Sequence, residues 1–115
     1  MRAVTFQWLV IIIIHVEFPF SGAQTVHRAF GLKDGRYGVE QLQALFDDQM
    51  DPYYSKRKKT ISSADVLLID EISMLSMRVL NLVDQVCRIC RGHSDMVMGG
   101  LQVILVGKQT VIVIQ

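Results

Sequence analysis

Two adjacent carboxylates, Asp70 and Glu71, follow the apolar run Val66–Ile69, which does not alternate with polar residues. Such a run is typical of a strand buried on both faces of a parallel sheet. Acids are costly to bury without compensation, and open α/β sheets bind ligands at the carboxyl ends of their strands. We therefore expect the pair to face a cleft, where Asp70 holds Mg²⁺ through water and Glu71 orients or deprotonates an attacking water. Nucleotide hydrolysis uses such an arrangement.

A simpler interpretation of the pair stays open. The two acids could end a strand and begin a helix that Ser73 caps, since acids are favoured near a helix N-terminus.

The helix that follows is the clearest of the chain, because its apolar residues recur at three-and-four spacing. These residues are Leu75, Val79, Leu82, Val83, Val86, Ile89 and Cys90. Gly92 is a natural stop for this helix.

A second apolar run, Leu101–Val106, begins after the Gly99–Gly100 turn and predicts another buried strand. Strand, helix and strand at this spacing predict a parallel unit. A parallel sheet of only two or three strands would leave apolar edges unpaired, which favours aggregation. Upstream, Val39–Asp47 reads as a short amphipathic helix that Asp51–Pro52 ends.

The residues Lys56, Arg57, Lys58 and Lys59 are expected in a loop after Pro52. The net charge of +1 gives no global attraction to nucleic acid, so DNA binding would need a local patch of this kind. Tyr53 and Tyr54 could stack on bases while the cations meet phosphates. A solvated loop and a nuclear-localisation signal are the alternatives.

Cys87 and Cys90 lie within the predicted helix, where buried thiols are the favoured interpretation. A zinc site with His93 would be one ligand short. At 115 residues the chain has room for one domain. Its apolar start fits either a secretory signal ending at Ala23 or a strand built on Val10–Ile14.

Three strings occur in the order found in one helicase family. Ala64–Leu75 resembles the Walker B segment of the Pif-type DNA helicases, a superfamily-one group, and Ile72-Ser73-Met74 distinguishes it from other Asp-Glu motifs. Gly99–Gly107 resembles the strand that leads into the family's next motif. Gly22–Gly31 resembles the Gly-x-Thr-x-His segment that follows its first DNA-contacting motif. The resemblance covers roughly residues 21–107, so we expect 1–20 and 108–115 to be apolar segments foreign to the family.

The resemblance implies an α/β fold, part of a P-loop NTPase (RecA-like) parallel sheet with flanking helices, incomplete. It implies an ATP-dependent five-prime-to-three-prime DNA helicase that uses Mg²⁺ and acts in repair, recombination and telomere maintenance. Thr25 and His27 would lie near DNA; a structural role is the alternative for His27. Single-stranded and forked DNA and the remainder of the motor would be partners, and no membrane is expected. The nucleus, and also the mitochondrion, are the implied locations.

The departures from the family pattern affect the expected activity. The sequence contains no Gly-x-x-x-x-Gly-Lys-Ser/Thr loop, and Lys108-Gln109 follows Gly107 where the family has Asp and a phosphate-sensing Gln. Gln109 is therefore not assigned that role, and we expect the chain alone to be inactive in ATP hydrolysis. Two other functions stay open: a non-catalytic nucleic-acid or protein binding module derived from the motor, and a small secreted protein whose signal is residues 1–23.

Overall fold

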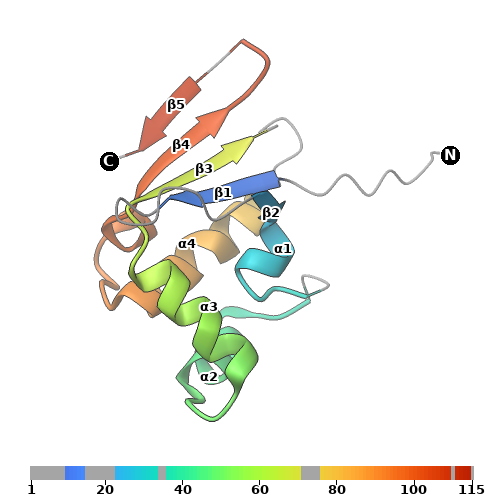
Figure 1. Ribbon diagram of the computed structural model, residues 1–115, viewed down its shortest axis with the longest axis vertical. Helices are drawn as coiled ribbons and strands as arrows, with labels where there is room; N and C mark the ends of the chain where they lie inside the picture. The colour runs from blue at the N-terminus through green and yellow to red at the C-terminus, as the bar shows by residue number, and fades with distance from the viewer. Residues whose placement is uncertain (1–9, 15–22, 34–35, 71–75, 110, 115) are drawn as a thin grey trace, which may run out of the picture.

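The computed structural model describes residues 10–14, 23–33, 36–70, 76–109 and 111–114. Five strands form one sheet in the order β2-β1-β3-β4-β5, and the helices lie on one side of it (Figure 1). The strands are β1 (Val10–Ile14), β2 (Ala23–Thr25), β3 (Val66–Asp70), β4 (Gln102–Val106) and β5 (Val111–Ile114). The helices are α1 (Val26–Ala29), α2 (Val39–Asp47), α3 (Pro52–Ser62), α4 (Met77–Arg91) and the 3-10 helix η2 (Val97–Gly100).

β3 and β4 are the parallel pair that the strand–helix–strand pattern predicts, with α4 in the connection. The other pairings, β1 with β2 and β3 and β4 with β5, are antiparallel. The α/β class with flanking helices is confirmed and is consistent with part of a RecA-like domain. The sheet is mixed rather than wholly parallel. At the β4–β5 end the reason is that a connection of a few residues, 107–110, joins only antiparallel neighbours.

Burial alternates along the two central strands. In β3, Leu67 and Ile69 are buried while Val66 and Leu68 are only half-buried, and β4 follows the same pattern. The expectation that β3 is buried on both faces was therefore wrong, because the described helices pack against one face of the sheet (Figure 1). The core lies between that face and the helices.

The basic residues lie in a helix, which corrects the expectation of a loop. The Asp51 side chain accepts a hydrogen bond from the Tyr53 amide at 3.0 Å and so caps α3. Pro52 occupies the first turn, where its missing N–H would have no helical partner. The Asp51-Pro52 pair therefore begins a helix rather than ending the previous one. The middle of α3 is almost entirely polar, so its sequence shows no apolar periodicity that would predict a helix.

The helices that had a clear apolar stripe are confirmed. α2 spans Val39–Asp47 as predicted, with Leu42 and Phe46 buried. The predicted stripe of α4 faces the core from Val79 to Cys90, whereas Leu75 lies outside the described residues, and Gly92 ends the helix in the left-handed conformation with φ 70°. Ser76 caps α4 by accepting a hydrogen bond from the Val79 amide. Ser73, the cap expected in the alternative interpretation, lies outside the described residues. No helix among the described residues is long and apolar enough to span a membrane.

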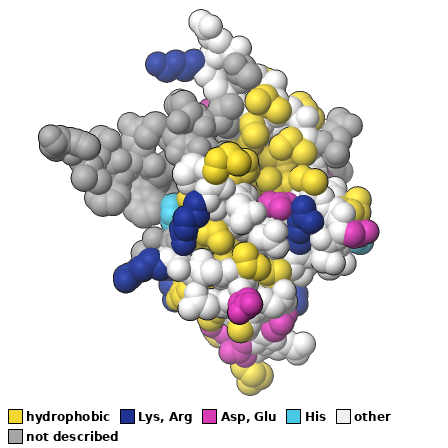
Figure 2. Space-filling model, turned by 180° about the vertical axis from the view of Figure 1, so that it is seen from behind, with side chains coloured by type: hydrophobic (Ala, Val, Ile, Leu, Met, Phe, Trp, Pro, Cys, Tyr) yellow, Lys and Arg dark blue, Asp and Glu magenta, His cyan; other side chains and the backbone are white. Residues whose placement is uncertain are grey.

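Both outer edges of the parallel pair are covered, which corrects the expectation of unpaired apolar edges. β1 pairs along β3, and β5 pairs along β4. The strand interpretation of Val10–Ile14 is therefore confirmed, whereas the rest of the expected signal segment, 1–9 and 15–22, lies outside the described residues. On β5 the side chains of Val111 to Val113 remain exposed. Figure 2 shows hydrophobic side chains gathered in its upper half, where β4 and β5 lie.

Candidate functional site

The register of the sheet brings Thr25 and Asp70 to the same sheet edge, the one formed by the carboxyl ends of β2 and β3. Ile11 of β1 pairs with Gln24 on one side and with Ile69 on the other. Thr25 and Asp70 are the residues that follow this row, and β2 runs parallel to β3 because both are antiparallel to β1. Only β1 separates the two strands, so their backbones lie about 10 Å apart at this edge. Two segments that are far apart in the sequence therefore meet at the carboxyl ends of their strands.

Asp70 is the last residue of β3 and is exposed. Its neighbour across the parallel ladder is Val106, the last residue of β4. Because side chains alternate along a strand, Asp70 lies on the face opposite the buried Leu67 and Ile69. Asp70 therefore stands where α/β sheets bind ligands, and its expected place in a cleft beside Mg²⁺ stays a prediction.

The donor set at this edge fits a magnesium ion held by few protein ligands. Mg²⁺ usually keeps several waters and is bound through one or two carboxylates plus substrate phosphates. Asp70 can supply one such carboxylate. Among the described residues no group of three or more His, Cys, Asp or Glu side chains could hold a metal by itself. Glu71, the expected water-activating residue, lies outside the described residues.

Thr25 links the sheet edge to α1. Its side-chain oxygen accepts a hydrogen bond from the Arg28 amide at 3.2 Å and so caps the helix. The hydroxyl hydrogen remains able to donate, because a threonine hydroxyl both donates and accepts. His27 is half-buried on α1, and its carbonyl accepts a hydrogen bond of 2.9 Å from the Leu32 amide. α1 is thereby held at the same sheet edge as Asp70.

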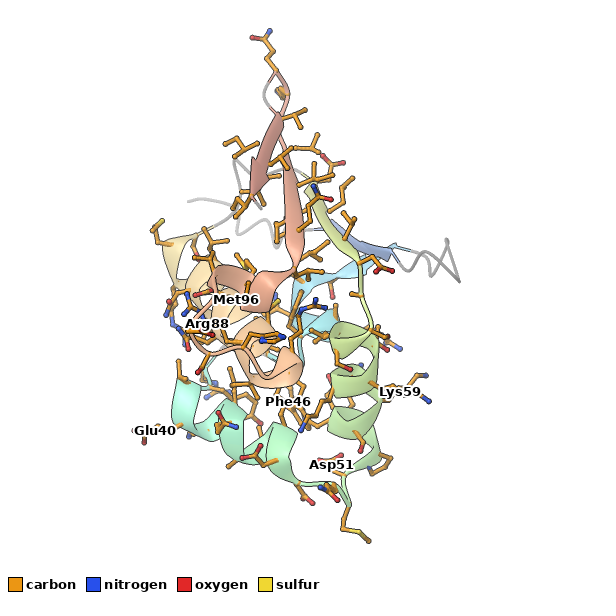
Figure 3. All side chains as sticks on the ribbon, turned by 90° about the vertical axis from the view of Figure 1, so that its left-hand side faces the viewer. Glu40, Phe46, Asp51, Lys59, Arg88 and Met96 are labelled. Carbon is orange, nitrogen blue, oxygen red and sulfur yellow. The ribbon has the colours of Figure 1, made fainter. Side chains whose placement is uncertain are left out.

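The helix α3 divides its basic residues between different surroundings. Lys56 and Lys59 are exposed, and Figure 3 shows Lys59 pointing away from the helix bundle. Lys58 is half-buried, and its charge acts on the thiol of Cys90 in α4. Arg57 turns toward α1, where its Nε donates to the Arg28 carbonyl at 2.6 Å. The predicted tetrad is therefore not one uniform patch.

The two tyrosines of α3 do not form the predicted stacking platform. Tyr54 is buried, and its ring meets Phe46 edge to face at a centroid distance of 5.0 Å. Tyr53 carries the Arg57 guanidinium 3.5 Å above its ring centroid, and Arg57 Nη1 also donates to the Tyr53 carbonyl at 3.0 Å. The prediction that both tyrosines stack on bases was therefore wrong for Tyr54. Four-residue spacing in a helix brings Tyr53 and Arg57 together.

Two cations that the sequence did not single out complete this surface. Lys33 is exposed, and its Nζ lies 5.1 Å from the Tyr53 ring centroid. Arg28 is exposed on α1, where its carbonyl accepts the bond from Arg57. Lys56 shares the Tyr53 face of α3 because it follows Tyr53 by three residues. We call Arg28, Lys33, Lys56 and Arg57 the α1–α3 basic surface. Helical spacing in α3 was the signal that could have indicated part of it.

A hollow elsewhere in the molecule lies far from this edge. It has a volume of about 250 Å³ between α4, η2 and β5 and is mostly apolar, with Met77, Leu80 and Ile114 in its wall. Ile114 pairs with Val103 near the amino end of β4, whereas Asp70 pairs with Val106 at the carboxyl end. This hollow therefore belongs to the opposite end of the sheet from Asp70.

Comparisons with known proteins agree with the resemblance to the Pif-type DNA helicases. The chain is 33% identical over 86 residues to the ATP-dependent DNA helicase RRM3 of Saccharomyces cerevisiae, a match that covers 75% of the chain and 11% of that protein. It is 46% identical over 50 residues to the ATP-dependent DNA helicase Pif1 of a Psychrobacter species, covering 44% of the chain and 7% of that protein. No protein-family model and no solved structure matches the chain. The chain spans about a tenth or less of the length of these curated relatives. Over the residues that match, it is a relative of the Pif-type DNA helicases.

Proposed function

We propose that residues 21–107 are part of the first motor domain of an ATP-dependent DNA helicase that unwinds DNA in the five-prime-to-three-prime direction. The observation that carries the proposal is the position of Asp70 at the carboxyl end of β3, within the parallel pair that β3 forms with β4. A motor that couples ATP hydrolysis to movement needs its nucleotide site and its DNA contacts on one connected framework. In this chain α1 begins at Thr25, and β1, a strand from outside residues 21–107, pairs with both β2 and β3 and so holds Thr25 beside Asp70.

Asp70 and Glu71 would act on the nucleotide. In this proposal Asp70 holds Mg²⁺ through water, and Glu71 orients or deprotonates the water that attacks ATP. Mg²⁺ would neutralise charge on the phosphates when bound. The exposed position of Asp70 at the end of a parallel strand supports this role, because a hydrated ion and a triphosphate need open space.

Thr25, His27 and the basic residues of α3 would act on DNA. Thr25 is assigned a backbone phosphate contact through its hydroxyl hydrogen, and His27 follows it by two residues in the first turn of α1. Lys56 and Lys59 are the exposed cations of α3 and would meet phosphates, with Arg57 and Lys58 as their less exposed neighbours. Single-stranded and forked DNA and the remainder of the motor are the proposed partners. Repair, recombination and telomere maintenance in the nucleus, and also in the mitochondrion, are proposed with them.

The two ends of the chain are proposed to lie outside the helicase-like unit. Residues 1–20 contain β1, which runs antiparallel to β3. Residues 108–115 contain β5, which runs antiparallel to β4. This difference in direction supports a boundary near residue 21 and another near residue 107. The parallel pair and the helices around it would then be the inherited part.

The proposal is tested by measuring two kinds of binding on the whole chain. Fluorescence anisotropy with a labelled single-stranded oligonucleotide should show binding that weakens as salt is added. A fluorescent ATP analogue should bind in a way that depends on Mg²⁺, and Asp70→Asn should remove that dependence while oligonucleotide binding changes little. Asp95→Asn, an exposed acid after α4, is the matched control and should alter neither result. A chain that lacks one of these two kinds of binding would contradict the proposal.

A non-catalytic binding module derived from the motor is the second candidate. The absence of a Gly-x-x-x-x-Gly-Lys-Ser/Thr string from the sequence favours it, because that loop cradles the phosphates in related motors. The same measurements separate the two candidates. Oligonucleotide binding with no Mg²⁺-dependent nucleotide binding would select the module, and the effect of Asp70→Asn would then vanish.

A further inference from the structure

The Tyr53 ring is already occupied by neighbouring groups. The Arg57 guanidinium carbon lies 3.5 Å from its centroid, and the Lys33 ammonium lies 5.1 Å from it. The ring of Tyr54 also contacts it, with centroids 4.9 Å apart and an angle of 66° between the planes. These contacts use the π-face that a nucleic-acid base would need for stacking.

Arg57 is held in this position by hydrogen bonds as well as by the ring. Its Nε donates to the Arg28 carbonyl at 2.6 Å and its Nη1 to the Tyr53 carbonyl at 3.0 Å. A base that stacked at the guanidinium's place would have to displace it and break the cation–π contact and both hydrogen bonds. Phosphates need no such displacement, because Arg28, Lys33 and Lys56 are exposed.

We propose that the α1–α3 basic surface recognises a nucleic-acid strand by its phosphates alone, with the bases facing away from Tyr53. The inference rests on the proposed DNA function and makes it more specific. The ligand class is an extended chain of phosphates, and recognition by cations without base contacts carries no sequence information. Tyr53 is a positioning residue that holds cations in place.

The experiment compares three labelled probes on the whole chain: a single-stranded oligonucleotide, an abasic strand of the same length, and inorganic polyphosphate. Equal affinity for the two strands, with polyphosphate competing for the same surface, supports the inference. An abasic strand that binds about tenfold more weakly, the loss expected when stacked bases contribute, would overturn it while leaving DNA binding intact. Polyphosphate binding without binding of either strand would overturn this inference together with the proposed DNA function.

Variants make the test independent of overall affinity. Lys33→Gln and Lys56→Gln should each reduce the slope of log affinity against log salt by about 0.7, the change expected for one neutralised phosphate on a single strand. Lys108→Gln, an exposed cation in the β4–β5 connection, is the control and should leave the slope unchanged.

Arg57→Gln gives the sharpest contrast, because it removes the guanidinium that lies 3.5 Å from the Tyr53 ring centroid. In this variant the intact strand should bind more tightly than the abasic strand, although both bind more weakly than in the unchanged protein. A ratio that stays equal to that of the unchanged protein would overturn the claim that the guanidinium blocks stacking. The thermal unfolding midpoint of each variant checks that the chain remains folded at the temperature of the binding measurements.

Discussion

The hydroxyl of Tyr54 donates a hydrogen bond of 2.7 Å to the carbonyl of Gly31, and both groups are buried. The bond connects α3 to the turn that follows α1. Together with the bond from Arg57 to Arg28, it fixes the helix that carries the basic residues against the helix that begins at the sheet edge. The proposed DNA contacts therefore depend on a buried framework beneath them.

Tyr54→Phe should destabilise the protein by about 1–3 kcal/mol, because it leaves the buried Gly31 carbonyl without its donor. Urea unfolding followed by circular dichroism measures the loss. Tyr53→Phe is the matched control, since Tyr53 is only half-buried, and should change stability by less than about 0.5 kcal/mol. Equal effects of the two changes would show that the Tyr54 hydrogen bond does not carry the connection.

Gly31→Ala should be more destabilising than Gly92→Ala, although both glycines have left-handed backbone, with φ of +67° and +70°. An added Cβ at Gly31 would lie 2.5 Å from Tyr54 Cε1, whereas at Gly92 nothing lies within 4 Å. Gly92→Ala therefore measures the backbone cost alone, about 1–2 kcal/mol, and the difference between the variants measures the clash. Similar unfolding midpoints for the two variants would contradict the close packing of Tyr54.

The elements with a strong apolar pattern were predictable from the sequence. The stripe of α4, the helix α2 and the strands β3 and β4 were found because burial of one face imposes a period that composition reveals. α3 was missed because its middle is almost entirely polar and its start depends on a capping bond from Asp51 rather than on periodicity.

The candidate site was predictable only in part. Asp70 follows a recognisable strand, so its place at the strand's carboxyl end could be foreseen. Its alignment with Thr25 could not, because it depends on how β1 pairs with both neighbours. Lys33 and Arg28 were missed for a similar reason: they meet Tyr53 and Arg57 through tertiary packing that local sequence does not encode.

Stability should fall at alkaline pH because of the two thiols of α4. Burial raises the pKa of Cys87 above its ordinary value near 9, and burial also raises the pKa of Cys90, to about 12, against the opposing charge of Lys58. The unfolded chain releases these protons from about pH 9, while the folded chain retains them to higher pH, so rising pH favours unfolding. Burial likewise raises the pKa of Tyr54 to about 12, which acts in the same direction near pH 10 and above.

Urea midpoints measured from about pH 7 to about pH 10.5, on either side of the ordinary thiol pKa, check this dependence. The midpoint should change little below about pH 8 and then fall steadily. Cys90→Ala removes one of the two thiols, so its curve should fall less steeply. A flat curve through the whole range would contradict the burial of the thiols.

Arg91→Lys should destabilise the protein by about 1–3 kcal/mol. The guanidinium donates to the carbonyls of Ala64 at 2.8 Å, Ile61 at 3.2 Å and Gly99 at 3.1 Å, and so ties the end of α3 to η2. A lysine ammonium cannot reproduce this planar set of donors. Arg78→Lys, an exposed change on the same helix, is the control for thermal unfolding and should have no measurable effect. Equal thermal unfolding midpoints for Arg91→Lys and the unchanged protein would contradict this connection between α3 and η2.

The central claim is that the α1–α3 basic surface, next to the sheet edge of Thr25 and Asp70, binds a DNA strand. Titration of isotope-labelled protein with a single-stranded oligonucleotide, followed through its backbone amide NMR signals, tests it most directly. We predict saturable shifts on α1, around Lys33 and along the exposed side of α3, with little change in η2 and β5. Shifts confined to η2 and β5, or no shifts at any oligonucleotide concentration, would contradict the account.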